Sequence, residues 1–307
     1  MVELQPSKLI TRVRFPPPAS LTFPAHELDQ RVERAVGSAP VRYTARPGGY
    51  STADRFSVEV ADGRRIFVKS AEDVNLAGWL RREHEVYSSV QGGFIPRLEG
   101  WDDDGTRPVL AIEDLSDADW VPRWDAARVG AVVAALAEIA ASAHPANTHP
   151  VGDSFPGIFD RWAVVARDPE PFLSAGVRDR AWLDKWLPVI VAAAETVDSS
   201  GSSLLHLDVR SDNLCFRDGR AILVDWNWAT LGNPLLDLAA WLPSLACEGG
   251  PYPWEVLPGG AAYGALVSGV WAAVVGLPPP ETAPAVREIQ CRQLEVALAW
   301  CERELVA

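Results

Sequence analysis

The segment 204–225 constrains the fold and chemistry of this chain more than any other. It contains His206 and Asp208, with Asn213 five residues after the acid, and then an apolar run that ends in Asp225. On a short loop beside a strand, two acids and an amide can face one small volume. Carboxylate and amide oxygens are ligands that Mg²⁺ accepts, and a carboxylate can also take a proton from a hydroxyl group. The segment therefore predicts a site where a general base and a divalent cation lie together.

The first third of the chain alternates short β-rich runs with one helix. Strands are expected over 41–46, 55–60, 64–69 and 108–114, and a helix is expected over 73–90. Asp62-Gly63 stands between two of these runs and is a strong hairpin signal. After residue 115 the pattern is mainly helical, with helices expected over 123–143, 179–197, 235–245 and 281–305, and a buried helix over 261–277.

This order predicts an α+β fold of two lobes. A small β-rich N-lobe would span residues 31–115 and bind a nucleotide, and a larger helical C-lobe would span 116–307 and carry the catalytic loop and acceptor site. Residues 1–30 contain several prolines and no sustained periodicity, so they are expected to form a flexible arm.

Two charged residues of the first lobe are further candidates. Lys69 ends the run 64–69, and Glu83 follows within the predicted helix. Glu85 is the alternative acid of this helix, and it points about 160° away from Glu83 around the helix. Glu83 is preferred because it shares a helix face with the apolar residues Leu80 and Tyr87.

Together these segments resemble the aminoglycoside phosphotransferase and choline kinase-like family, which has a protein kinase-like fold. The loop at 206–213 has the H-x-D-x-x-x-x-N spacing of kinase catalytic loops. The aromatic-rich stretch 224–229, then 232–234 and 237–239, resemble the other motifs of the family, and the resemblance extends over about residues 35–305. The family often has glycine where this chain has Leu207, a departure expected to be mild because both functional side chains stay in place.

The resemblance implies a role for each candidate residue. Asp208 would be the catalytic base, Asn213 and Asp225 would hold Mg²⁺, and Lys69, braced by Glu83, would hold the phosphates of ATP, with GTP as the alternative nucleotide. Structural support is expected from His206 and Asp237. Further nucleotide contacts are expected in the phosphate-covering turn and the hinge between the lobes, from Gly49, Ser51, Glu113 and Leu115.

The expected acceptor is a small hydroxylated molecule such as an aminoglycoside, an amino sugar or an amino alcohol. Four residues in or after the catalytic segment are candidates for its binding site, because aromatic rings stack on sugars and cations and acids pair with amines: Trp228, Trp241, Glu248 and Trp254.

Charge and composition exclude other classes of partner. The formal net charge of −13 disfavours nucleic acid and anionic membranes. The four cysteines form no C-x-x-C pair, which favours a reduced, cytoplasmic protein. A monomer or homodimer is expected. A protein kinase is disfavoured because Asp225-Trp226-Asn227 stands where such enzymes have D-F-G. An ATP-binding pseudokinase or regulatory protein without transferase activity is the alternative function.

Overall fold

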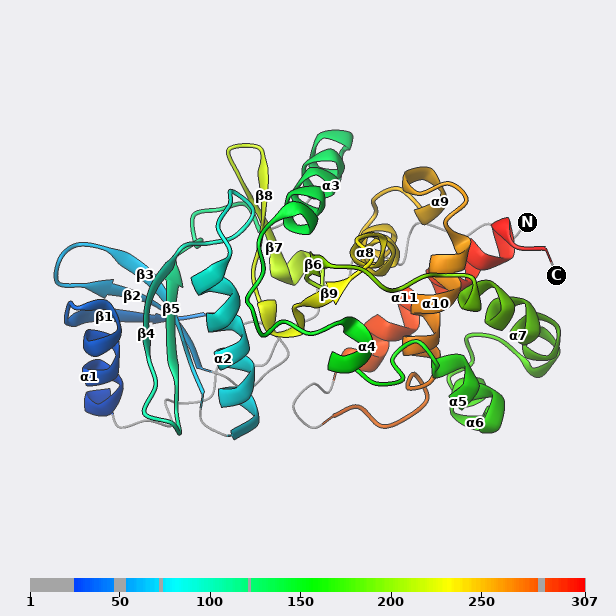
Figure 1. The fold of residues 1–307 in the computed structure, drawn as a ribbon, viewed down its shortest axis with the longest axis horizontal. Helices are drawn as coiled ribbons and strands as arrows, with labels where there is room; N and C mark the ends of the chain where they lie inside the picture. The colour runs from blue at the N-terminus through cyan, green and yellow to red at the C-terminus, as the bar shows by residue number, and fades with distance from the viewer. Residues whose placement is uncertain (1–24, 47–53, 72–73, 121–122, 281–284, 307) are drawn as a thin grey trace.

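The computed structural model describes residues 25–46, 54–71, 74–120, 123–280 and 285–306, and it has the two-lobed α+β architecture (Figure 1). The smaller lobe contains one antiparallel sheet, in the order β1-β2-β3-β5-β4, and two helices. Its strands are β1 (Pro40–Ala45), β2 (Asp54–Val60), β3 (Arg65–Ser70), β4 (Leu98–Asp102) and β5 (Val109–Glu113). Its helices are α1 (Ala25–Val36) and α2 (Val74–Ser89).

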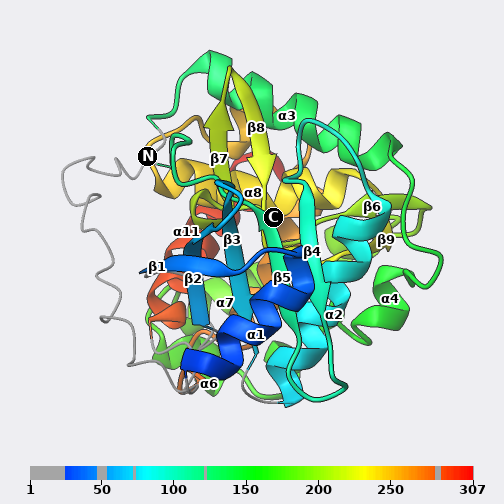
Figure 2. The same ribbon diagram turned by 90° about the vertical axis from the view of Figure 1, so that its left-hand side faces the viewer.

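The two helices cover opposite faces of this sheet, because side chains alternate between faces along a strand (Figures 1 and 2). Val109 and Ala111 of β5 pack in one hydrophobic cluster with α1, and Leu110 and Ile112 pack in another with α2. Lys69 lies on the face of the sheet that α2 covers, because the neighbouring Val68 packs with α1 on the opposite face. The sheet therefore directs the Lys69 side chain towards α2 and the space between the lobes.

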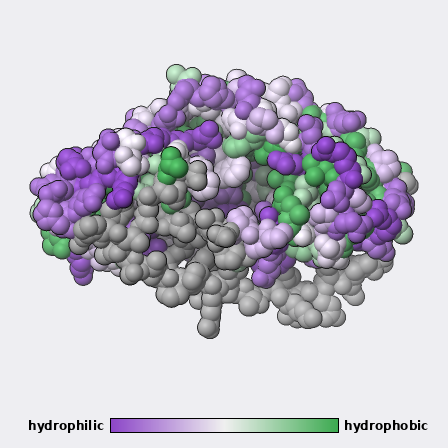
Figure 3. All heavy atoms as spheres, turned by 90° about the horizontal axis from the view of Figure 1, so that it is seen from below, coloured by the Kyte–Doolittle hydropathy of each residue, from purple (hydrophilic) through white to green (hydrophobic). Residues whose placement is uncertain are grey.

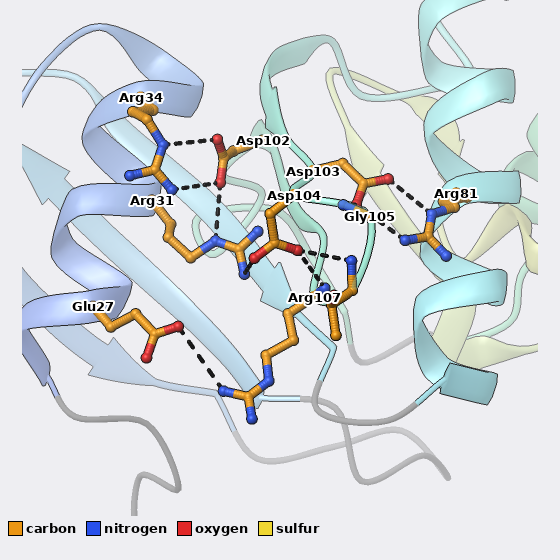
Figure 4. Close-up of polar contacts among 10 residues, drawn as sticks. Glu27, Arg31, Arg34, Arg81, Asp102, Asp103, Asp104, Gly105 and Arg107 are labelled. Atoms are coloured by element: carbon orange, nitrogen blue, oxygen red, sulfur yellow. Dashed lines mark hydrogen bonds and ion pairs between the residues drawn. The ribbon is translucent and has the colours of Figure 1, made fainter.

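Helix α1 includes residues 25–30, which the sequence places in the flexible arm. These six residues are helical here, because Leu28 and Val32 of this helix are buried against the sheet, and residues 1–24 lie outside the described residues. Arginines on α1 also hold the β4–β5 connection (Figure 4). The Nε atoms of Arg31 and Arg34 lie 2.9 Å and 3.0 Å from different carboxylate oxygens of Asp102.

The larger lobe is mainly helical and carries two small hairpin-like sheets. Its helices are α3 (Ala126–Ala141), α4 (Val151–Ser154), α5 (Arg161–Arg167), α6 (Glu170–Ser174), α7 (Arg180–Glu195), α8 (Leu235–Cys247), α9 (Pro253–Val256), α10 (Ala261–Ala272) and α11 (Val286–Glu304). Its strands pair as β6 (Ser203–Leu205) with β9 (Thr230–Gly232), and as β7 (Leu214–Arg217) with β8 (Arg220–Leu223). Two short 3₁₀ helices, η2 (Ser211–Asn213) and η3 (Trp226–Trp228), flank the β7–β8 hairpin.

The principal elements predicted from the sequence are present, with ends shifted by a few residues. The hairpin signal at Asp62-Gly63 is confirmed by the antiparallel pairing of β2 with β3. The buried helix expected over 261–277 is α10. Helix α1, strand β4 and the short helices α4, α5, α6 and α9 were not predicted. Within the described part of the chain, no helix is long and apolar enough to span a membrane.

One hydrophobic cluster runs through both lobes. It includes Leu80 of α2, Ile139 of α3, Trp226 of η3, Trp241 of α8 and Trp300 of α11, all of them buried. Hydrogen bonds add to this continuity, because the backbone N–H of Leu223 in β8 donates to the carbonyl of Phe94, which precedes β4. The β7–β8 hairpin is thus attached to the small lobe although it follows the large lobe's first helices in the sequence.

Candidate active site

The catalytic loop follows β6 and is held by a buried histidine. His206 Nε2 donates to the Val224 carbonyl at 2.9 Å, so Nδ1 is free to accept the backbone N–H of Asp208 at 3.2 Å. Burial lowers the pKa of His206 and thereby favours the neutral ring that this pattern requires. Both ring nitrogens therefore have partners within the loop, and the ring fixes the backbone on which Asp208 stands.

Asp237 supports the same loop from α8. Its carboxylate accepts the backbone N–H groups of His206 and Leu207, at 2.8 Å and 2.6 Å. These bonds hold Leu207 at a φ of 58°, in the left-handed region. The departure from glycine is therefore less mild than the sequence suggests, because a branched residue here carries backbone strain that glycine would not.

Asp208 is fixed by two donors. Its Oδ2 accepts from Asn213 Nδ2 at 2.8 Å and from Arg210 at 3.1 Å. Burial raises the pKa of Asp208, Arg210 opposes this rise, and the nearby charge of Asp225 adds to it. A raised pKa makes a carboxylate a stronger base near neutral pH. Because the Asn213 nitrogen is committed to Asp208, its Oδ1 is the atom left to bind a cation.

Lys69, Glu83 and Asp225 form a buried charge cluster between the lobes. Lys69 Nζ lies 2.7 Å from Glu83 Oε2 and 2.8 Å from Asp225 Oδ1. Burial alone would raise the pKa of Asp225, but the Lys69 ammonium and the Arg55 guanidinium outweigh it and hold this pKa well below its ordinary value. Asp225 is therefore ionised, as a metal ligand must be. Glu83 is the helix residue that contacts the lysine.

A cavity of about 320 Å³ adjoins this cluster and extends to the hinge. Lys69, Asn213, Asp225, Glu113 and Leu115 all line it. Asn213 and Asp225 thus supply two oxygen donors on one cavity wall, which suits a Mg²⁺ ion that takes its remaining ligands from phosphates and water.

Arg55 also lines this cavity, and the sequence analysis did not select it. It lies directly opposite Lys69 in the β2–β3 register. Two like charges opposite each other destabilise a strand pair unless anions lie between them. The signal that could have found Arg55 was the hairpin itself, because the turn at 62–63 brings the end of one strand to the start of the other. Arg210, the cation beside Asp208, was also missed, although it lies within the motif.

The hinge residues behave differently from each other. The Glu113 carboxylate accepts from Arg217 at 2.6 Å, which ties the hinge to β7. The Leu115 carbonyl accepts from both Trp120 Nε1 and the Ala118 N–H, so its two lone pairs are already used. This carbonyl is therefore not available to an adenine. Gly49 and Ser51, expected in the phosphate-covering turn, lie outside the described residues.

A second cavity, of about 360 Å³, shares Asp212 and Asp225 with the first. Asp208, Asp225 and Trp228 line it, together with residues of α10 and α11 that the sequence did not indicate. The remaining acceptor candidates lie elsewhere. Trp241 is fully buried in the core, and Trp254 stacks on Tyr252 away from either cavity.

Glu248 is not an acceptor-binding acid in this structure. It accepts from Ser211 Oγ at 2.6 Å and from Trp124 Nε1 at 3.0 Å. Both partners belong to the protein framework, and Glu248 lines neither cavity. Its contacts instead connect the end of α8 with the catalytic segment and the start of α3.

Comparison with known proteins gives one family match and several similar folds. The model of the phosphotransferase enzyme family matches residues 42–265. A thermostable mutant of aminoglycoside phosphotransferase APH(4)-Ia is 17% identical with a TM-score of 0.57, over 90% of this chain and 97% of that one. A choline/ethanolamine kinase family protein from Mesorhizobium loti is 14% identical with a TM-score of 0.57, over 91% and 95%.

Amicoumacin kinase hAmiN, in complex with AMP-PNP, Ca²⁺ and its ligand, is 10% identical with a TM-score of 0.56, over 89% of this chain and 93% of that one. At these identities the structures establish a shared fold. No curated protein sequence matches the chain.

Proposed function

The chain belongs to the phosphotransferase enzyme family, and we propose that it transfers the γ-phosphate of ATP to a hydroxyl group of a small acceptor. The observation that carries this proposal is that Asp225 lines both cavities. Of the two cavities, Lys69 and Asn213 line only the first and Asp208 lines only the second. A phosphate held at Asp225 would therefore stand between a nucleotide and an acceptor.

Each residue has a task that its geometry supports. Lys69 and Arg55 would bind the phosphates, and Asp208 would orient the acceptor hydroxyl and accept its proton. Asn213 and Asp225 would hold Mg²⁺, which neutralises charge on the phosphate oxygens when bound. The amicoumacin kinase complex, which contains AMP-PNP and a divalent ion, supports the proposal that this chain binds a nucleotide together with a metal ion.

The test is ATP-dependent phosphorylation of a panel of hydroxylated acceptors, with Asp208→Asn as the decisive variant. This change keeps the shape of the side chain but removes its basicity, so kcat should fall by about 10²–10⁴-fold. Asp184→Asn, at an exposed position on α7, removes the same formal charge and serves as the matched control. An unchanged kcat in Asp208→Asn would exclude it as the base. ATP binding without transfer to any acceptor would support a binding protein instead.

A further inference from the structure

The walls of the 360 Å³ cavity are mostly hydrophobic. They are formed by Ile158 and Phe159 ahead of α5, by Val270 and Trp271 at the end of α10, and by Ile289 of α11. Seen from below, hydrophobic surface borders the central hollow on the larger lobe, whereas the smaller lobe is mainly hydrophilic (Figure 3). A cavity of this size and character suits a ligand whose body is apolar.

The charged groups of the cavity gather at its reacting end. Among the described residues that line it, the carboxylates are Asp208, Asp212 and Asp225. Each has a cation within 3.2 Å, since Arg210 pairs with the first two and Lys69 with the third. The acids are thus committed to the catalytic cluster and leave none for a distant substrate ammonium.

Apart from Arg210 and the indole N–H groups of its tryptophans, the other polar side chains of this lining are amides. Asn227, Gln290 and Gln293 line the cavity. Gln293 Nε2 donates to Ser244 Oγ at 2.6 Å, and Gln290 Oε1 accepts from Arg287 at 2.5 Å. Amides can orient a hydroxyl or carbonyl, but they do not repay the cost of taking an ammonium out of water. Asn227 Oδ1 has no hydrogen-bond partner among the described residues and is open to a ligand hydroxyl. A molecule with several ammonium groups would meet only such neutral acceptors outside the catalytic cluster, among the described residues, and these do not repay the hydration that it loses.

Two aromatic residues at the edge of the cavity offer further apolar surface to a ligand. Trp79 of α2 and Trp228 of η3 both line it, and they are 46% and 41% exposed, respectively. They come from different lobes, so a ligand in the cavity can contact both. Covering such exposed rings with apolar surface is favourable, whereas leaving them in water is not.

Leu207 contributes an apolar side chain to the same cavity. It does so from the left-handed backbone conformation described above, which glycine would adopt without strain. The catalytic loop thus presents a hydrophobic group directly beside Asp208.

From these features we infer that the acceptor is a mostly apolar, uncharged alcohol and not a polycationic amino sugar. The inference rests on the proposed function, because it concerns the acceptor side of Asp208. It replaces the expectation that amino sugars and amino alcohols are preferred.

The test is direct binding, measured by isothermal titration calorimetry on the full chain with AMP-PNP and Mg²⁺ present. The apolar probes are naphthylethanol, cyclohexylethanol and a monohydroxy steroid, and the cationic probes are kanamycin and choline. At least one apolar alcohol should bind with a negative heat capacity change, the marker of apolar burial, and at least about 10-fold more tightly than either cation. Tighter binding of a cation, or no binding of any apolar alcohol, would overturn the inference.

Variants of Ile289 locate the binding to this cavity. Ile289→Ala should weaken the alcohol by roughly 10–200-fold, the range seen for lost methylenes in apolar pockets. Ile289→Asp should weaken it further and shift the preference towards the cationic probes. Val133→Asp, on the exposed side of α3, is the matched control and should leave alcohol binding unchanged. Equal affinities of wild type and Ile289→Ala would show that the alcohol binds elsewhere and would refute the inference.

Binding and turnover measurements together distinguish a failure of the proposed function from a failure of the inferred acceptor class. If apolar alcohols bind as expected but Asp208→Asn phosphorylates them as fast as wild type, the assigned catalytic base is wrong and the acceptor class stands. If kanamycin or choline is phosphorylated in an Asp208-dependent reaction while no apolar alcohol binds, the proposed function stands and the acceptor class is wrong.

Discussion

Replacing Leu207 by glycine and by alanine measures the backbone strain in the catalytic loop. An L-residue in the left-handed region costs about 1–2 kcal/mol, and glycine avoids this cost. Glycine also loses about 0.4–1 kcal/mol relative to alanine, because it gives the unfolded chain more freedom. Both substitutions remove most of the partly buried side chain. The variants therefore differ mainly in strain and in chain entropy.

Leu257 provides the matched position. It is also partly buried and outside any helix or strand, but its φ is −128°, where alanine is unstrained. At Leu257 alanine should be the more stable variant, whereas at Leu207 the preference should shrink or reverse. At each position, the free energy of unfolding of the alanine variant is subtracted from that of the glycine variant. This quantity should be about 1–2 kcal/mol more favourable to glycine at 207 than at 257, and the excess measures the backbone strain.

The free energy of unfolding of the four variants can be compared by urea denaturation followed through tryptophan fluorescence. Leu207→Asn should lie on the glycine side, because asparagine tolerates the left-handed region. If alanine is preferred over glycine by the same amount at both positions, the loop holds no such strain. The argument that an apolar side chain is maintained there at a cost would then fail.

Three further predictions follow from the charged groups. Arg31→Met should destabilise the protein by about 1.5–3 kcal/mol in urea unfolding, because it removes the hydrogen bond that a buried guanidinium makes to a partly buried carboxylate. Arg34→Met removes a solvent-exposed partner of the same acid and should change stability little, so equal effects of the two variants would contradict this reasoning. Arg210→Gln should raise the pKa of Asp208 further, because Arg210 opposes the rise that burial causes. Since the base must be ionised, the acid limb of the kcat–pH profile should move to higher pH. An unmoved limb would show that Asp208 is not the group that titrates in this profile. Asp225→Ala should greatly reduce the thermal stabilisation by AMP-PNP with Mg²⁺, and an undiminished shift would exclude Asp225 from the metal site.

The catalytic segment could be predicted because its information is local. His206, Asp208 and Asn213 stand within one loop, and Asp225 follows one hairpin later, so spacing alone brings them together. Lys69 and Glu83 could be paired because the family resemblance implies a lysine–glutamate pair, and helical periodicity favoured Glu83 over Glu85. The contact between Lys69 and Asp225 joins these two sets across the lobes, and the structure places it at 2.8 Å.

The acceptor side could not be predicted in the same way, because its walls come from distant helices. Nothing local distinguishes Trp241, which is buried, from Trp228, which lines the cavity, since burial depends on which helices pack around each ring. Glu248 was selected as a free acid, but two framework donors use it. Ile289 had no chemical signature at all, because an apolar wall and an apolar core have the same composition.

The hydrophobic cluster that passes from α2 through Trp226 to Trp300 bears on how the protein unfolds. Two lobes with separate cores would melt independently, each with its own enthalpy. Here neither lobe can open without exposing side chains that the other lobe covers, so the lobes should behave as one cooperative unit. Differential scanning calorimetry should then give a single endotherm whose van't Hoff and calorimetric enthalpies agree. A nucleotide bound beside Lys69 would, by mass action, stabilise helices as distant from it as α11.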